Sequence, residues 1–168
     1  VPTPMQVQGL PPARELHLGY SYACIVSDAR EVWCWGENWG AQSGRDNTLV
    51  VEPSKLPLGQ VQILRTGTHG GCALLDDQRN VVCWGRAPDP KTFSEPVVDL
   101  DVGEEHACAV IESGEIRCWG DNYFGQSGAD DPIRGMSDAV QVSAGIEHTC
   151  AVKSDNTVWC WGDNDERQ

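Results

Sequence analysis

The tripeptide Cys34-Trp35-Gly36 decides the fold, because the same three residues recur three more times along the chain. The further copies are Cys83-Trp84-Gly85, Cys118-Trp119-Gly120 and Cys160-Trp161-Gly162. An earlier cysteine precedes each copy, so the eight cysteines fall into the pairs Cys24 and Cys34, Cys72 and Cys83, Cys108 and Cys118, Cys150 and Cys160. A segment that recurs roughly every 40 residues is the signature of a repeat architecture. We therefore expect similar repeated units within one domain spanning residues 1–168.

The residues around each cysteine pair predict a β-hairpin. In the third copy, an apolar run from Ala107 to Ile111 is followed by polar residues from Glu112 to Glu115 and then by Ile116-Arg117-Cys118-Trp119. This order is typical of two antiparallel strands joined by a tight polar turn. Alternating stretches such as Val97 to Val102 precede the hairpins and are expected to form further strands. The chain is therefore expected to be all-β.

The hairpin also predicts how the cysteines pair. Cys24 and Cys34 lie at similar distances from the centre of the turn, so they stand opposite each other on neighbouring strands. Opposed residues approach to about 4.5 to 5.5 Å between their Cβ atoms, which is close to the separation a disulfide needs. Structural zinc sites use ligands about two to four residues apart, so zinc is the weaker interpretation. Four disulfides favour an oxidising location, which is extracellular, at the cell surface or periplasmic.

The repeated motif resembles that of a known family. Gly-x-x-His-x-Cys-Ala-Val followed by Cys-Trp-Gly-Asp-Asn-x-x-Gly-Gln-x-Gly is similar to the repeat of the regulator of chromosome condensation family, in the cysteine-paired form of secreted bacterial proteins. The repeat cores are residues 19–44, 67–85, 103–128 and 145–164. The resemblance is weakest in the second core, where Gly70 replaces the histidine and a proline-rich segment replaces the Asn-x-x-Gly-Gln loop.

This resemblance implies a β-propeller built of four-stranded antiparallel blades. The chain holds about four repeats, whereas complete members of the family usually have seven blades. The four repeats are therefore expected to close unusually tightly, to form part of a larger ring, or to share a ring with a second chain. Val1 to Leu10 resembles the outer segment that ends a repeat, while the last repeat stops soon after Asn164. We expect residues 1–10 to complete the blade that contains Val158 to Trp161, either within one chain or in a homodimer.

Most of the tryptophans flank the paired cysteines. Large aromatic side chains at such positions favour packing between blades over a ligand cage. The tryptophans expected in this role are Trp33, Trp35, Trp84, Trp119, Trp159 and Trp161.

Charge and hydropathy exclude several classes of partner. The formal net charge is −13 and the isoelectric point is near 4.5. Affinity for nucleic acid depends on basic residues that displace counterions from phosphates, so no nucleic-acid partner is expected. The sequence has no apolar stretch of about eighteen residues or more, so no membrane insertion is expected either.

The longest connections, Glu37 to Pro57 and Asp121 to Ser137, carry the candidate binding residues. These are the aromatic residues Trp39, Tyr123 and Phe124. Loops on rigid scaffolds often carry binding residues, and aromatic side chains are favoured anchors in protein interfaces. The alternative is that these side chains fold back over the edge of a blade. We expect the partner to be another protein.

The remaining polar repeats favour structural roles. His106, His148 and Tyr22 occupy the same place in three repeats, which suggests a shared hydrogen bond to a neighbouring blade. Glu37, Asp121 and Asp163 follow the Trp-Gly pairs; they could bind calcium, but they also suit turns.

No motif for catalysis or phosphate binding is present, so we expect no catalytic residues, no cofactor, no metal and no enzyme activity. The leading function is a secreted, disulfide-stabilised propeller module that binds another protein through its end-face loops. An inhibitor of an extracellular hydrolase is one alternative. A carbohydrate-active or lyase enzyme that uses the central channel is another.

Overall fold

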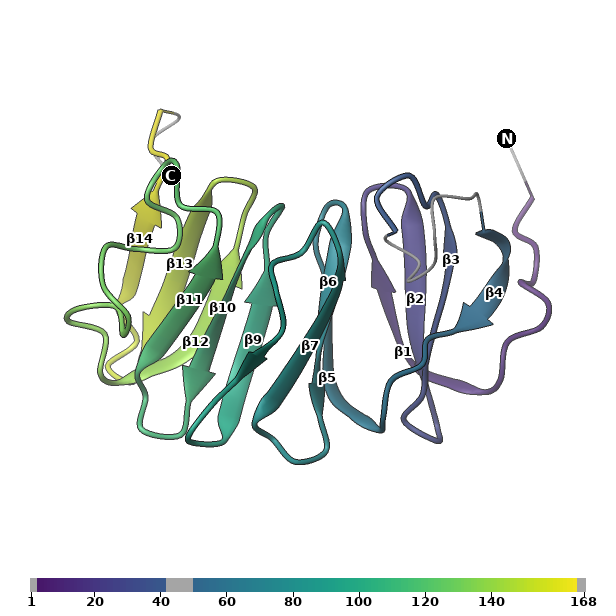
Figure 1. The fold of residues 1–168 in the computed structure, drawn as a ribbon, viewed down its shortest axis with the longest axis horizontal. Coiled ribbons are helices and arrows are strands. Elements are labelled where there is room, and N and C mark those ends of the chain that lie inside the picture. The colour runs from purple at the N-terminus through teal and green to yellow at the C-terminus, as the bar shows by residue number, and fades with distance from the viewer. Residues whose placement is uncertain (1–2, 42–49, 166–168) are drawn as a thin grey trace.

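A computed structural model describes residues 3–41 and 50–165, and this part of the chain forms four antiparallel sheets (Figure 1). Blade 1 contains β1 (Ala13–Leu18), β2 (Tyr22–Ser27), β3 (Val32–Gly36) and β4 (Val50–Lys55). Blade 2 contains β5 (Val61–Thr66), β6 (Gly70–Leu75), β7 (Asn80–Gly85) and β8 (Lys91–Thr92). Blade 3 contains β9 (Val97–Val102), β10 (His106–Ile111) and β11 (Ile116–Gly120). Blade 4 contains β12 (Ala139–Ala144), β13 (His148–Lys153) and β14 (Val158–Gly162).

The four sheets lie side by side in chain order, as the blades of a propeller do (Figure 1). Residues 3–10 and β14 lie at opposite ends of the row, so the ring is open. The predicted all-β class and blade architecture are confirmed, although four strands per blade is right for blades 1 and 2 alone. The described residues contain no helix that is long and apolar enough to cross a membrane.

The four disulfides join the predicted pairs, because strand register places each pair directly opposite. Cys24 faces Cys34 in the β2–β3 pair, and Cys150 faces Cys160 in the β13–β14 pair. The Cα atoms of the bridged residues lie 4.0 to 4.1 Å apart. The second pair is separated by 11 positions rather than 10, and the additional residue is accommodated in the turn between β6 and β7.

Apolar side chains fill the three junctions between successive blades. In junction 1, between blades 1 and 2, Val32 and Leu56 of blade 1 pack with Leu64 of blade 2. Junctions 2 and 3 repeat this arrangement further along the chain. The third-strand residues at these sites are Val32, Val81 and Ile116, and the first-strand residues are Leu64, Leu100 and Val142. All six are at most 3% exposed, and burying each such side chain contributes about 1.5 to 3 kcal/mol.

The outer strand of a blade differs from one repeat to the next. In blade 3 a loop takes its place: the Ile133 amide donates to the Ile116 carbonyl oxygen at 2.9 Å, and Met136 fills junction 3. In blade 4 no strand of the described residues pairs with the outer edge of β14. Residues 3–10 form no strand, so the expected closure within one chain is not present in this structure. Their pairing with β14 of another copy stays a prediction. Residues 42–44 of the first repeat core lie outside the described residues.

Candidate protein-binding face

One end of the propeller gathers two loops from every blade, and we call it the loop face. Each blade contributes the turn between its first two strands and the loop that follows Cys-Trp-Gly. The amide of Asp121 donates to the Glu105 carbonyl oxygen at 2.9 Å, and that of Glu37 to the Ser21 carbonyl oxygen at 2.9 Å. Equivalent bonds join Arg86 to His69 and Asp163 to Glu147. These repeated backbone bonds fix both sets of loops at the same end, uppermost in Figure 1.

The glycine of Cys-Trp-Gly makes this geometry possible. Gly36, Gly85, Gly120 and Gly162 all have positive φ, between 76° and 114°. A Cβ atom on Gly120 would lie 2.4 Å from the Glu105 carbonyl oxygen. The chain therefore needs glycine both for its backbone angle and for the close approach of the loop to the turn.

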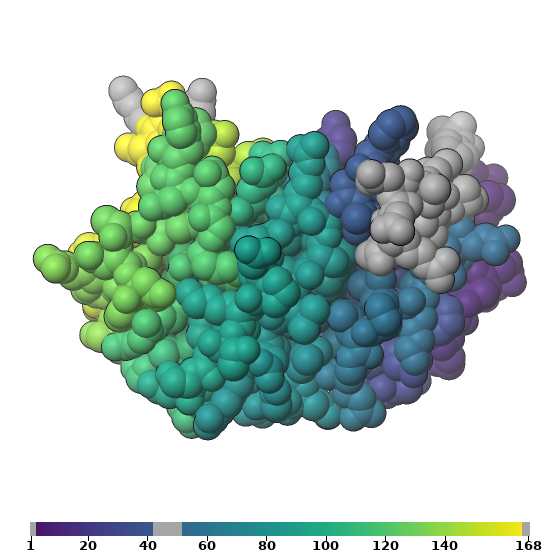
Figure 2. Space-filling model, viewed as in Figure 1, coloured from purple at the N-terminus to yellow at the C-terminus, as the bar shows by residue number. Residues whose placement is uncertain are grey.

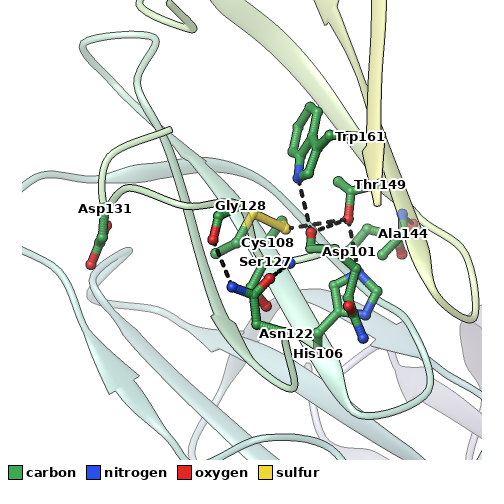
Figure 3. The surroundings of a disulfide bond; sticks show 12 residues. Asp101, His106, Cys108, Asn122, Ser127, Gly128, Asp131, Ala144, Thr149 and Trp161 are labelled. Atoms are coloured by element: carbon green, nitrogen blue, oxygen red, sulfur yellow. Dashed lines mark hydrogen bonds between the residues drawn. A yellow bond between two sulfur atoms is a disulfide. The ribbon is translucent and has the colours of Figure 1, made fainter. Parts of the chain in front are cut away.

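Polar side chains within loop 121–128 hold it in one shape (Figure 3). The Asn122 amide nitrogen donates to the Gly128 carbonyl oxygen at 2.8 Å, and the Ser127 backbone amide donates to the Asn122 side-chain oxygen at 2.9 Å. The Gln126 side chain is 2% exposed, donates to the Asp121 carboxylate at 2.8 Å and accepts from the Phe124 amide at 2.9 Å. The Asp-Asn-x-x-Gly-Gln motif of residues 121–126 thus builds a loop that is closed by its own hydrogen bonds.

The same loop also ties blade 3 to blade 4. The carbonyl oxygen of Gln126 accepts from the Trp161 indole nitrogen at 2.9 Å and from the Thr149 hydroxyl at 3.0 Å. Thr149 in turn contacts His106, whose Nε2 lies 2.8 Å from its hydroxyl oxygen (Figure 3). Because the Thr149 hydroxyl donates to Gln126, the His106 Nε2–H group is the donor to Thr149. This bond agrees with the predicted framework role of His106.

Burial keeps His106 neutral. Its side chain is fully buried, and desolvation lowers its pKa from 6.5 to about 4; Asp121 opposes this shift and His148 adds to it. The Nδ1 atom has no hydrogen-bond partner among the described residues. Protonation would place a charged N–H group there without an acceptor, which is costly. His106 is therefore a neutral link between blades and is poorly suited to acid–base chemistry near pH 7.

Trp39 and Tyr123 occupy equivalent positions in the loops of blades 1 and 3. In each loop, an asparagine carbonyl oxygen accepts from the amide three residues later, Asn38 from Ala41 and Asn122 from Gly125, both at 3.1 Å. The aromatic residue follows the asparagine and points into solvent: Trp39 is 83% exposed and Tyr123 is 84% exposed. The alternative, that these side chains fold back over a blade edge, is therefore wrong for both residues.

The structure brings Tyr123 and Phe124 together but not Trp39. The two rings make an edge-on contact with centroids 4.9 Å apart, which leaves Phe124 41% exposed. The loops of blades 1 and 3 rise on either side of blade 2, as the blue and green segments at the top of Figure 2 show. Sequence reasoning missed Tyr20, which is 80% exposed in the first turn and contacts the His69 ring edge-on. Its place in the turn before β2 gave no signal, because a tyrosine there could equally have been buried.

Acidic residues are frequent on the loop face. The loops and turns of the loop face carry Glu37, Asp89, Glu104, Glu105, Asp121, Glu147, Asp163 and Asp165. Their basic neighbour Arg86 lies 4.0 Å from Glu105. No group of three His, Cys, Asp or Glu side chains within residues 3–41 and 50–165 is placed to hold a metal ion. The loop face therefore carries carboxylates at the same end of the propeller as the exposed aromatic rings.

A cavity of about 340 Å³ opens at the ends of the innermost strands. Its lining comes from all four blades and includes Leu18, Tyr20, Thr66, Val102 and Ile146. The described lining residues contribute no carboxylate, imidazole, thiol or amine. Most glycoside hydrolases use a pair of carboxyl groups, which this lining lacks. The Tyr20 phenol is the one side chain in the described lining that could serve as a general acid or base.

The fold and the repeats define a class of protein. The regulator of chromosome condensation (RCC1) repeat model matches residues 97–126 and 139–168, which cover blades 3 and 4. This match identifies two segments of the chain, residues 97–126 and 139–168, as similar to repeats of the regulator of chromosome condensation family, as the sequence motif predicted.

Solved structures with a similar fold cover nearly the whole chain. Prp20p from Saccharomyces cerevisiae superposes with a TM-score of 0.75 and 22% identity, over 89% of this chain and 44% of its own. Human WBSCR16 gives a TM-score of 0.75 and 16% identity, over 95% and 50% of the two chains. The ectodomain of the Arabidopsis thaliana receptor kinase ACR4 gives 0.64 and 23%, over 89% and 49%. The chain thus spans half the length of these structures or less, and the likeness concerns the fold.

Proposed function

We propose that this chain is a secreted, disulfide-stabilised module that binds another protein through its loop face. The observation that carries the proposal is the exposure of Trp39 and Tyr123, at 83% and 84%, on segments 37–41 and 121–128, whose backbones make hydrogen bonds. Rigid exposed aromatic side chains contribute large contact areas at a small cost in conformational entropy. Tyr123 and Phe124 form one anchor, and Trp39 forms a second on the far side of blade 2.

The charge of the loop face selects the kind of partner. Glu37, Glu105 and Asp121 lie on the same face as the anchors, and the whole chain has a net charge of −13. Complementary charge speeds association and suppresses wrong partners. We expect a partner surface with apolar pockets for the aromatic rings and lysine or arginine side chains around them.

Two further observations support the proposal. Prp20p, which shares the fold, is a protein with binding properties to Gsp1p and histones, so this fold can serve protein contact. The four disulfides favour an oxidising location outside the cytosol.

Affinity capture from the extracellular fraction of the source organism tests the proposal. The immobilised wild-type chain, a Tyr123→Ala/Phe124→Ala double variant and a Trp159→Ala control are compared. Trp159 is 55% exposed but lies on β14, away from the loop face. We expect a protein that binds the wild type and the control but binds the double variant at least about tenfold more weakly.

Equal capture by the wild type and the double variant would contradict the proposal for this anchor. If the captured protein is a hydrolase, titrating its activity with the chain decides whether binding also inhibits it. Inhibition that is lost in the double variant would establish the inhibitor alternative.

A further inference from the structure

Junction 2, between blades 2 and 3, lacks a side chain that junctions 1 and 3 have. Tyr22 begins β2 and His106 begins β10, and each forms a hydrogen bond with the next blade. Strand register gives Gly70, the first residue of β6, the same place in blade 2. A Cβ atom on Gly70 would lie 2.4 Å from the Trp84 carbonyl oxygen. No side chain at this position can therefore cross from blade 2 to blade 3.

Ion pairs span junction 2 instead. Three pairs of opposite charge join the two blades, and blade 2 supplies the cation in each. The nitrogen–oxygen distances are 3.4 Å for Arg65 and Asp99, 3.2 Å for Lys91 and Asp131, and 4.0 Å for Arg86 and Glu105. His69 adds a contact of 3.7 Å to Glu104, which is ionic when the imidazole is protonated. The first pair is the least screened by solvent, because the Asp99 side chain is 16% exposed.

The other two junctions depend less on ion pairs. Within residues 3–41 and 50–165, junction 1 has one such pair, Arg30 with Asp76, and junction 3 has none. Lys153 pairs with Asp138 inside blade 4, because Asp138 leads directly into β12. Junction 2 thus differs from both neighbours in the number of charges that face each other across it.

The composition of the two blades agrees with this difference. Residues 96–137, which form blade 3, contain nine Asp and Glu but only two Arg and no Lys. Residues 60–95, which form blade 2, contain four basic and four acidic side chains, and three of the four basic ones pair with blade 3. An acidic blade attracts these cations over distances up to about 8 Å at physiological salt. The charge of blade 3 therefore reinforces the pairs.

We infer that junction 2 is an electrostatic joint, which opens more readily as the ionic strength rises, whereas junctions 1 and 3 respond much less. At about 0.5 M salt the Debye length falls to about 4 Å, so that exposed ion pairs are largely screened. The apolar cluster of junction 2 is unaffected by this screening and keeps the two blades in place. Salt therefore increases the frequency of local opening without separating the blades.

The joint lies between the two aromatic anchors of the loop face. Trp39 belongs to blade 1 and Tyr123 to blade 3, so junction 2 is one of the two junctions that separate them. Opening of the joint changes the distance between the anchors, so ionic strength would adjust how a partner engages both. This consequence rests on the proposed function, whereas the joint itself does not.

Amide hydrogen exchange of the full chain, followed by NMR, tests the joint with matched reporters. The first residue of an inner strand donates across each junction to the preceding blade, at 2.7 to 3.0 Å. The reporters are Val61 to Arg30, Val97 to Gln78 and Ala139 to Gly114 for junctions 1, 2 and 3. From about 20 mM to about 500 mM NaCl, exchange at Val97 should accelerate at least about threefold relative to the other two. Equal changes at all three amides would overturn the proposal.

A triple variant locates the effect. Arg65→Gln, Arg86→Gln and Lys91→Gln together remove the cations of the joint but keep polar side chains there. At low salt, Val97 in this variant should exchange as fast, relative to Val61 and Ala139, as it does in the wild type at high salt. Added salt should then have no further differential effect. A wild-type salt response in this variant would also overturn the proposal.

The control variant removes three cations whose ion pairs lie within single blades. Its substitutions are Arg14→Gln, Lys55→Gln and Arg134→Gln. It has the same net charge as the first variant and should keep the salt response of the wild type. Loss of the response in both variants would assign it to net charge and count against the joint. None of these exchange measurements needs a partner, so their outcome and that of the capture experiment are independent.

Discussion

Junction 1 and junction 3 join their blades in the same way but with different polar side chains. In junction 1 the Tyr22 hydroxyl crosses to blade 2 and donates to the carbonyl oxygens of Gly70 at 2.6 Å and Gly67 at 3.2 Å. In junction 3 the shorter His106 crosses to the hydroxyl of Thr149 at 2.8 Å. The longer tyrosine side chain donates to backbone carbonyl oxygens, whereas the shorter histidine side chain bonds to the side chain of Thr149. The comparison teaches that the crossing residue and the receiving residue differ together, so that each junction keeps a hydrogen bond between its blades.

Removing the crossing side chain from junction 1 should have the largest effect. Tyr22 is 4% exposed, and Tyr22→Ala leaves a void between the blades. We expect a loss of about 3 to 5 kcal/mol in the free energy of unfolding, measured by urea titration. Tyr22→Phe keeps the ring and should cost about 1 to 2 kcal/mol for the lost hydrogen bond. If both variants lose the same amount, the hydroxyl rather than the ring holds the junction.

Acid should weaken junction 3 and spare junction 1. The pKa of His106 is lowered by burial to about 4, so between about pH 4 and pH 6.5 the unfolded state binds more protons at this residue than the folded state. Stability therefore falls as the pH drops through this window, by about 3 kcal/mol in total. Burial raises the pKa of Tyr22, so that side chain stays neutral throughout.

His106→Gln is the matched variant for this pH effect, because its amide can still donate to Thr149 but does not titrate. The difference in stability between the wild type and the variant should shrink or reverse from pH 7 to pH 4.5, measured by urea titration at each pH. Carboxylates titrate in both proteins and cancel in the difference. Parallel pH profiles would show that His106 does not set the acid sensitivity.

The disulfides allow a third test, because Cys24–Cys34 lies within a buried junction and Cys150–Cys160 lies in blade 4, at the end of the row. Cys24 and Cys34 are fully buried in junction 1, whereas Cys160 is exposed at the end of the row. Reductant reaches an exposed disulfide more readily. Under native conditions, peptide mapping should find Cys150–Cys160 reduced first, with a loss of about 2.5 to 3 kcal/mol as expected for opening a loop of about a dozen residues. Earlier reduction of Cys24–Cys34 would mean that junction 1 opens readily.

The smallest effect is expected on the loop face. Trp39→Ala should change the free energy of unfolding by less than about 0.5 kcal/mol, since the side chain is 83% exposed. Trp119→Ala is the contrasting variant: its ring contacts Phe93, and its indole nitrogen donates to the Asp89 carbonyl oxygen at 2.8 Å. The melting temperatures of the two variants, measured by thermal unfolding, give the comparison. Equal destabilisation would place Trp39 in the core and remove it from the binding face.

The hairpins and their disulfides could be predicted from sequence because they depend on local spacing. Cys108 and Cys118 are ten positions apart and are joined by a turn with Gly114, so their facing positions follow from strand geometry. The connection of blade 2 is a contrast. Its Asp89 carbonyl oxygen accepts from Trp119 just as the Gln126 carbonyl oxygen accepts from Trp161, although the two loops share no motif. Every residue type has a backbone carbonyl oxygen, so this acceptor could not be recognised in the sequence. The structure was needed to show that the two loops are equivalent.

Exposure at the ends of the row could not be predicted either. Leu16 and Leu64 are the same residue at the same position of a strand, yet one is exposed and the other is buried. The difference is that another blade packs against Leu64 but not against Leu16. The local sequence pattern is the same in both cases and does not show whether a neighbouring blade is present. The same reason explains Trp159, which was expected to pack between blades but is 55% exposed.

Every disulfide in the structure closes a single hairpin, and none links one blade to another. During oxidative folding, the correct partner of each cysteine is therefore the nearest cysteine along the chain. Closing such a short loop costs less chain entropy than joining cysteines of different repeats. The same locality makes each repeat a self-contained unit for recombination: duplicating or deleting a whole repeat leaves every remaining bridge intact. Propellers of this kind can thus gain or lose blades in evolution without a change in the disulfide pairing of the remaining repeats.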